Sequence, residues 1–322
     1  MMLVTPDMTT HGIRLIAPIA LACAGCSTTS TPHKAYVGLY GDNAVAVVDT
    51  EAQKVLTTIP VAAPDGLVVT PDGAKVYVSS GSAGVIDVID AATARVTTSI
   101  TVGAAPAGLA ITRDGRYLVA AVQGDGKAVI IDTATDAVTG AVAVGKAHNS
   151  ALSADGQTAY VASQVAAAPA IDLIGITAVT TGATFALDKT PRALATIGGK
   201  LYVTLAGADT IAVLDAATGQ AGTPIATAGA PHDIRPAPDG VHLLTVSQTA
   251  GELEVIDPGS ASIAAHVPTG KMPHWIALSS DGKLAYVTNE GDNNLVAIDL
   301  ATNAVVKTIS VGAGPRKIAV AP

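Results

Sequence analysis

Short apolar runs recur from about residue 35 to the end of the chain, and many have the form Tyr-Val-x-x. These runs begin at Tyr36, Tyr77, Tyr160, Tyr202 and Tyr286. Other segments, such as Val55 to Ile59, mix apolar and polar residues as strands with one exposed face do. The pattern therefore predicts an all-β chain built from many short strands.

Tight turns separate these runs at a nearly constant period. Five of the turns are Asp-Gly pairs and one is Gly-Gly, and their spacing along the chain stays between 41 and 43 residues. The pairs begin at Asp72, Asp114, Asp155, Gly198, Asp239 and Asp281. Glycine adopts the positive φ that such hairpin turns need, so each pair predicts a hairpin within one repeat.

A second turn in most repeats follows an aspartate that ends a strand. These aspartates are Asp49, Asp90, Asp132, Asp215, Asp257 and Asp299, usually with Thr or Ser three residues later. A carboxylate at this place can accept backbone N–H bonds and cap the turn. Residues 164–187 lack the motif, so the sequence does not define the loops of that blade.

Each repeat of about forty residues holds four strands, and a single four-stranded sheet cannot bury both of its faces. The sequence therefore predicts a seven-bladed β-propeller over residues 35–322, made of four-stranded antiparallel blades. The first strand, from Tyr36, and the last, Arg316 to Val320, are complementary parts of one repeat. We expect these N- and C-terminal segments to close one shared blade and remove the exposed sheet edge.

The repeats resemble those of the YVTN-repeat β-propeller family, which is named for the strand found here at Tyr286 to Asn289. The likeness covers residues 35–322, and phrases such as Pro273 to Gly282 recur in register. It implies a surface or periplasmic protein with a poorly defined ligand. Some members of the family accompany redox systems that use haem d1, quinone cofactors or copper.

The N-terminus reads as an export signal. Residues 13–24 form an apolar run of signal-peptide length, and the segment from Cys23 to Ser27 resembles a bacterial lipobox. We expect a lipoprotein-type signal peptide over 1–25, lipidation of Cys26 and a polar tether over 26–34. The alternative is an ordinary secretory signal that yields a secreted protein. In the first interpretation the lipid anchor is the only membrane contact, on the periplasmic or cell-surface side of a bacterial membrane.

Composition narrows the classes of partner. The formal net charge is −8 and the pI about 5.2, which gives no general attraction to nucleic acid. Both cysteines, Cys23 and Cys26, precede the repeats, so residues 35–322 hold no disulfide, thiolate ligand or cysteine nucleophile. We expect a monomer, no nucleic-acid partner, and either an anionic small molecule or a periplasmic protein as ligand.

One position, the residue after the proline that enters each inner strand, is rich in cationic side chains. The seven aligned residues are Asp65, Ala107, His148, Arg192, His232, His274 and Arg316, where Ala147 replaces the proline before His148. Five of the seven are cationic or can become so, which predicts an anion-binding site at the channel mouth with Arg192 and Arg316 as fixed charges.

Two other interpretations of this position remain open. In the first, each side chain bonds a carbonyl of the neighbouring blade. Alternatively His148, His232 and His274 hold a metal ion such as zinc or copper. Alternation along the strand points Trp275 away from the channel, so we expect it to pack between blades.

Sequence motifs for several chemistries are missing. The chain has no Cys-x-x-Cys-His, Gly-x-x-x-x-Gly-Lys, Gly-x-Ser-x-Gly or His-Glu-x-x-His motif. Glu290 and Asp233 are the only carboxylates to consider as general bases, and neither is paired with a nucleophile in the sequence. We predict no cofactor and a non-catalytic scaffold that binds a ligand or a protein through the channel mouth. The alternatives are a lactonase- or lyase-like enzyme that uses the channel-mouth histidines, and an accessory protein for a periplasmic redox system.

Overall fold

The computed structural model describes Met2 and residues 34–322. The predicted signal peptide, Cys26 and the tether up to residue 33 lie outside the described residues. Every regular element in the described part is a β-strand, and there are 28 of them. No helix in this part of the chain is long and apolar enough to cross a membrane.

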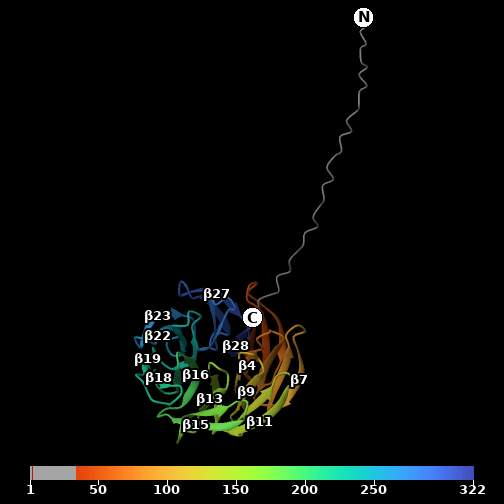
Figure 1. Ribbon diagram of the computed structural model, residues 1–322. Helices are drawn as coiled ribbons and strands as arrows, with labels where there is room; N and C mark the ends of the chain where they lie inside the picture. The colour runs from red at the N-terminus through yellow and green to blue at the C-terminus, as the bar shows by residue number, and fades with distance from the viewer. Residues whose placement is uncertain (1, 3–33) are drawn as a thin grey trace. The chain divides into compact units, whose positions relative to one another are not determined.

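The strands form seven antiparallel four-stranded sheets, which confirms the predicted seven-bladed β-propeller (Figure 1). The innermost strands are β4 (Pro64–Val69), β8 (Pro106–Ile111), β12 (Ala147–Leu152), β16 (Pro191–Ile197), β20 (Pro231–Pro236), β24 (Pro273–Leu278) and β28 (Pro315–Val320). The second strands are β1 (Lys34–Leu39), β5 (Lys75–Ser80), β9 (Tyr117–Val122), β13 (Thr158–Ser163), β17 (Lys200–Leu205), β21 (Leu243–Ser247) and β25 (Leu284–Asn289).

The outer half of each blade holds the other two strands. The third strands are β2 (Ala44–Asp49), β6 (Val85–Asp90), β10 (Lys127–Asp132), β14 (Ala170–Gly175), β18 (Thr210–Asp215), β22 (Glu252–Asp257) and β26 (Asn294–Asp299). The outermost strands are β3 (Lys54–Pro60), β7 (Arg95–Thr101), β11 (Ala137–Ala143), β15 (Thr180–Ala186), β19 (Ile225–Ala226), β23 (Ser262–Pro268) and β27 (Ala304–Ser310).

The ring closes through the two ends of the propeller chain, as the repeats predict. One sheet has the order β28-β1-β2-β3, in which Tyr36 on β1 pairs with Ala319 on β28. Each inner strand contacts the inner strands of both neighbouring blades, so the seven surround a common axis. Closure pairs the edge of β1 that would otherwise be free.

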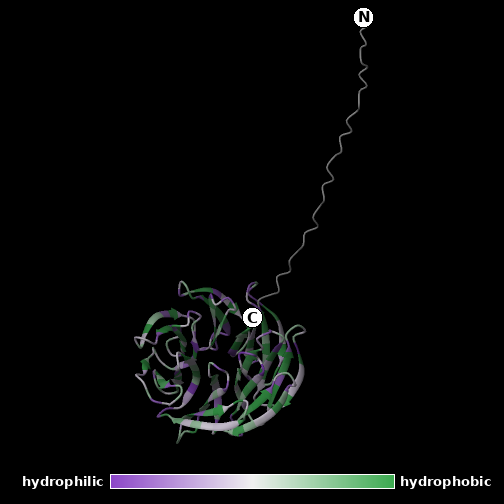
Figure 2. Cartoon of the chain, in the orientation of Figure 1, coloured by the Kyte–Doolittle hydropathy of each residue, from purple (hydrophilic) through white to green (hydrophobic). Residues whose placement is uncertain are grey.

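The core lies between adjacent blades. The second strands and most third strands are largely buried, as β1 and β2 are, whereas outer strands such as β7 expose nearly every residue. Hydrophobic residues accordingly run through the strands in Figure 2. The tyrosines of the repeat also link blades by hydrogen bonds. Tyr160, for example, donates to the carbonyl of Ala216 on the next blade at 2.9 Å.

The turns have the geometry that their residues predict. The glycines of the Asp-Gly turns have positive φ, such as 71° at Gly73, and Asp72 accepts a bond from the hydroxyl of Thr70 at 2.6 Å. The strand-ending aspartates accept backbone N–H bonds, as Asp299 does from Ala301 and Thr302.

The blade that lacks the Asp-x-x-Thr motif is regular, and a short outer strand occurs one blade later. Residues 164–187 contain β14 and a full seven-residue outer strand, β15, in which Val179 takes the positive-φ turn position. In the next blade the outer strand β19 has only two residues, Ile225 and Ala226. The missing Asp-x-x-Thr motif therefore did not signal a disrupted blade, because other residues complete the same turn.

Candidate functional site

The five predicted channel-mouth residues occupy equivalent positions, each the second residue of an inner strand. They are His148, Arg192, His232, His274 and Arg316. The closed ring brings them together around the axis, and the imidazole centroids of His232 and His274 lie 4.1 Å apart. Their assembly follows from the fold, while their role in binding a ligand stays a prediction.

The three histidines are neutral at pH 7. Burial lowers the pKa of His148 to about 4 and that of His232 to about 3, with the charges of Arg192 and Lys317 adding to the effect. Burial also holds the pKa of His274 well below its ordinary value. The fixed positive charges of the predicted site are therefore the two arginines alone.

Hydrogen bonds assign different roles to the imidazoles. His232 Nδ1 donates to the carbonyl oxygen of His274 on the neighbouring blade at 3.1 Å. This is the kind of contact expected if the side chains at this position only link adjacent blades. His148 Nδ1 accepts from Asn149 Nδ2 at 2.9 Å, whereas His274 Nδ1 is buried without a partner. The ligand atoms of His148, His232 and His274 do not gather within 4.8 Å of one another, so the described residues provide no three-histidine metal site.

The two carboxylates considered as general bases are both engaged by arginine. Arg316 Nε donates to Glu290 Oε1 at 3.1 Å, and its guanidinium carbon lies 3.7 Å from the centroid of the Tyr40 ring. Arg235 Nε donates to Asp233 Oδ2 at 3.1 Å. Neither carboxylate bonds a hydroxyl, and Glu290 Oε2 lies 3.9 Å from His274 Nε2.

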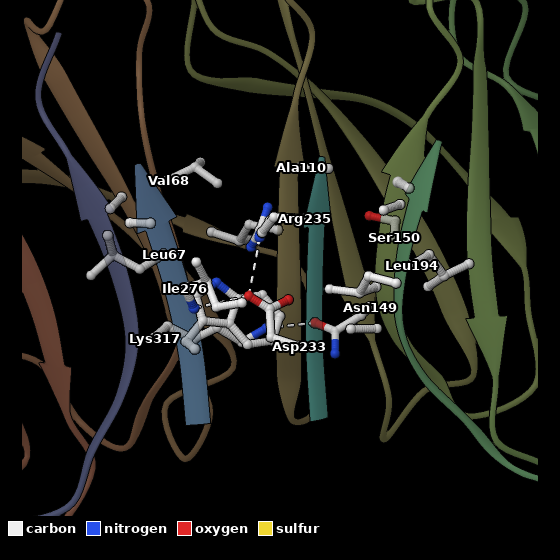
Figure 3. Close-up of a pocket in the computed structure, with 18 of the residues that line it drawn as sticks. Leu67, Val68, Ala110, Asn149, Ser150, Leu194, Asp233, Arg235, Ile276 and Lys317 are labelled. Atoms are coloured by element: carbon white, nitrogen blue, oxygen red, sulfur yellow. Dashed lines mark hydrogen bonds and ion pairs between the residues drawn. The ribbon is translucent and has the colours of Figure 1, made fainter. Parts of the chain in front are cut away.

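A second set of side chains, which sequence reasoning missed, lies at the centre of the ring. We call Asn149, Asp233, Arg235, Trp275 and Lys317 the central polar cluster. Figure 3 shows Asp233 and Arg235 from β20 converging with Asn149 from β12 and Lys317 from β28. The hydrogen bond and the ring contacts within the cluster join β12, β20, β24 and β28.

Lys317 is the most unusual member of the cluster. The residue is only 4% exposed, its ammonium donates to Asn149 Oδ1 at 2.6 Å, and Nζ lies 3.2 Å from the centroid of the Trp275 ring. Burial lowers the pKa of Lys317 to about 7, although Asp65 and Asp233 oppose the shift. Burying a lysine side chain lowers the stability of the folded protein, and groups with strongly shifted pKa values cluster at functional sites.

Asp233 is the counter-charge of the cluster. Its carboxylate is buried, and Oδ2 accepts from the backbone N–H of Ile276 at 3.0 Å as well as from Arg235. Burial raises the pKa of Asp233, while Arg235 and the Ile276 bond lower it. Asp233 thus bonds Arg235 directly, and its charge, together with that of Asp65, also favours the ammonium form of Lys317.

Trp275 is buried in a hydrophobic core shared by several blades, as expected, but it also borders the channel, so the expectation that it points away from the channel was wrong. Its ring faces both Lys317 and Arg235, whose guanidinium carbon lies 4.8 Å from the centroid, and it borders the central cavity. The physical reason is a β-bulge. Each inner strand shifts register after its first residue, as between Pro273 and Trp275, and a bulge breaks the alternation of side chains.

A cavity of about 480 Å³ lies beside the central polar cluster, lined by residues of all seven inner strands. The cluster supplies its polar groups, and the rest of the lining is largely aliphatic, with Leu67, Leu194 and Ile276 among the residues in Figure 3. None of the five predicted residues lines this cavity. They precede the lining segments on the same strands, so the cavity lies toward the strands' C-terminal ends.

The sequence did carry a signal for this cluster. The signal is at the next residue of each inner strand, one after the predicted channel-mouth position. Three repeats have a small residue there, namely Gly66, Gly108 and Ala193, and the other four have a large or polar one, namely Asn149, Asp233, Trp275 and Lys317. Space explains the small residues. A Cβ at Gly108 would lie 2.2 Å from Asn149 Oδ1, so glycine there leaves room for the neighbouring amide.

Solved structures of low sequence identity share this fold. Hydrazine synthase from Kuenenia stuttgartiensis is 20% identical with a TM-score of 0.72, covering 81% of this chain and 90% of its own. The dihydro-heme d1 dehydrogenase NirN is 17% identical with a TM-score of 0.67, covering 94% and 79%. AztD from Citrobacter koseri is 16% identical with a TM-score of 0.66, covering 90% and 98%. These likenesses show the fold alone.

Two family models match the chain, and a search of curated proteins finds no match. The model described as a YNCE-like β-propeller matches residues 190–321. The model described as the choice-of-anchor I domain matches residues 64–231, which is more than half of the chain. Together the two matches extend over most of the propeller. The chain therefore belongs to the choice-of-anchor I domain family.

Proposed function

We propose that this chain is an exported, non-catalytic binding protein that holds a small organic anion in the central cavity. The observation that carries the proposal is the buried ammonium of Lys317 at the polar side of that cavity. Its hydrogen bond to Asn149 and its place over Trp275 fix the charge in one position. An anion entering the cavity would meet an oriented cation with little competing water.

The dimensions and lining of the cavity support a small ligand. Its volume of about 480 Å³ falls within the roughly 300–1,000 Å³ typical of ligand pockets. Aliphatic walls and a few convergent polar groups are the usual composition of such sites. We therefore expect a ligand with one anionic group, held by Lys317 and Arg235, and an apolar body against the walls.

The channel-mouth residues complete this proposal as a second layer. Arg192 and Arg316 add positive charge near Lys317, since both lower the pKa of His274 together with Lys317. His148 binds the side chain of Asn149, which in turn accepts from Lys317. In this arrangement His148 helps to position Asn149 and thereby Lys317, and the two arginines add a positive potential that favours an anion.

Calorimetric titration with a matched pair of probes tests the proposal. The probes are 2-naphthoate and its neutral amide, 2-naphthamide, which share one apolar body. We expect naphthoate to bind at least about tenfold more tightly, because charge-assisted hydrogen bonds are stronger than neutral ones. Lys317→Met should remove the difference, whereas Lys283→Met, a change at a lysine whose side chain is 78% exposed, should keep it.

Two results would contradict the proposal. One is equal affinity for the charged and neutral probes. The other is naphthoate binding that Lys317→Met leaves intact. Native mass spectrometry after incubation with periplasmic extract would then identify the natural ligand, or a protein partner in place of a small molecule.

We also propose that the propeller is anchored by lipid at Cys26 on the outer side of a bacterial membrane and is monomeric. The apolar run over 13–24 and the residues before Cys26 support this localisation. Expression in a bacterial host tests it by fractionation. Cys26→Ser should release the protein from the membrane fraction, and gel filtration should give one chain; a membrane-bound variant would contradict the anchor.

A further inference from the structure

A buried carboxylate on the sixth blade along the chain lacks a partner for one of its oxygens. Glu254 on β22 has 0% exposure, and its Oε1 accepts from the N–H of Ala228 at 2.5 Å and from the hydroxyl of Ser247 at 2.9 Å. Its Oε2 is buried and makes no hydrogen bond. A buried carboxylate oxygen without a partner destabilises the fold, so Glu254 Oε2 is expected to bind a cation or to carry a proton.

The corresponding carboxylates on other blades are satisfied by the residue opposite. Asp87 accepts from Ser99 and Asp172 accepts from Thr184, each at 2.6 Å, and these are the partners across the strand pair. The residue opposite Glu254 is His266 instead. This blade therefore has an imidazole where the other two have a hydroxyl donor.

The imidazole turns to another carboxylate and forms a three-residue group. His266 Nδ1 lies 2.7 Å from Glu252 Oε1, and Glu252 stands two residues before Glu254 on the same face of β22. One ligand atom each from Glu252, Glu254 and His266 lies within 4.8 Å of the others. It is the one such group of three or more His, Cys, Asp or Glu side chains between residues 34 and 322.

We propose that Glu252, Glu254 and His266 form a binding site for a divalent transition-metal ion, with Zn²⁺ as the best fit. One imidazole and two carboxylates are common zinc ligands, and three protein ligands leave a fourth position for water. Ligand atoms around tetrahedral zinc lie roughly 3.3 Å apart, given bond lengths near 2.0–2.1 Å. The three ligand atoms, which lie within 4.8 Å of one another, therefore need to move only a short distance to reach this separation.

The site is open on one side, which lets an ion enter. The side chain of His266 is 54% exposed, so it can rotate toward an ion, whereas Glu254 is held by its bonds to Ala228 and Ser247. Thr227 Oγ1, next to Ala228 in the chain, is also buried without a partner. Burial and the charge of Glu252 raise the pKa of Glu254, and a bound cation would lower it again. This blade site is separate from the central cavity, whose lining includes none of the three ligands.

Equilibrium dialysis of the full chain with ZnCl₂ tests the site. All proteins carry Cys23→Ser and Cys26→Ser, so that thiols do not bind the metal. We expect one zinc ion per chain, and at least about a tenfold loss of affinity in Glu254→Gln and in His266→Gln. His242→Gln is the matched control, because His242 Nδ1 pairs with Asp239 Oδ2 at 2.6 Å without a third ligand, and it should leave affinity unchanged.

A second measurement covers the case in which Glu254→Gln folds poorly. Cobalt(II) should give weak visible absorption bands of a nitrogen- and oxygen-ligated ion, and His266→Gln, at an exposed side chain, should abolish them. Excess MgCl₂ should not displace zinc, since magnesium favours oxygen ligands. Absence of zinc binding, or zinc affinity that survives both substitutions, would overturn the proposal and leave Glu254 as a protonated carboxyl.

Discussion

Replacing Lys317 by methionine should make the protein more stable at neutral pH. Burial lowers the pKa of this lysine from 10.5 to about 7. Since each pKa unit corresponds to about 1.4 kcal/mol, burying the ammonium costs about 5 kcal/mol at pH 7 and below. Methionine removes this cost but leaves Asn149 Oδ1 without its donor, a loss of about 1–3 kcal/mol. The expected net gain at pH 7 is about 2–4 kcal/mol.

The sign of the pH dependence follows from proton counting. Between pH 7 and 10.5 the unfolded chain keeps the lysine protonated while the folded chain holds it neutral, so the stability of the parent protein rises with pH. The advantage of Lys317→Met should therefore shrink by about 3 kcal/mol between pH 7 and pH 9.5. This difference does not depend on the contribution of Asn149.

Urea unfolding of both proteins at pH 7 and pH 9.5 measures these quantities. Lys283→Met is the control, because its side chain is 78% exposed and a surface change should alter stability by less than about 0.5 kcal/mol at either pH. A destabilised Lys317→Met protein at pH 7 would refute the reasoning, and so would a gain that does not change with pH. Either result would mean that the lysine is better solvated or paired than the geometry indicates.

Three further predictions concern the centre and the closure of the ring. Gly108→Ala should weaken binding of 2-naphthoate and also lower Tm, because its Cβ would press on Asn149 Oδ1 and on the backbone carbonyl of His148, while Gly222→Ala, where the nearest atoms lie 3.6 Å away, should change neither. In an NMR titration from pH 7 to pH 5, His232 should stay neutral with its proton on Nδ1, whereas His266, whose pKa its bond to Glu252 raises, should gain a proton first; a reversed order would contradict the burial argument. Deleting residues 315–322 removes β28 and should cause aggregation or loss of cooperative unfolding by circular dichroism, because it opens the ring at β1, while deleting Pro322 alone should be tolerated.

The local sequence was enough to predict the architecture. Alternating strands, Asp-Gly turns and strand-ending aspartates are short-range signals, and each repeat carries its own copy, so the number of blades and the shared closing blade followed directly. The same periodicity placed His148, Arg192, His232, His274 and Arg316 at one level of the ring. A repeat fold turns equal sequence offsets into neighbouring positions in space.

Tertiary structure decided what those positions mean. Burial, which depends on the whole ring, makes the three histidines neutral and brings the pKa of Lys317 to about 7. The bulge in each inner strand turned Trp275 toward the channel, against simple alternation. The unpaired oxygen of Glu254 likewise depends on which residue lies across the strand pair. Repetition in the sequence determines where side chains stand, but the charge and partners of each depend on neighbours that are distant in the chain.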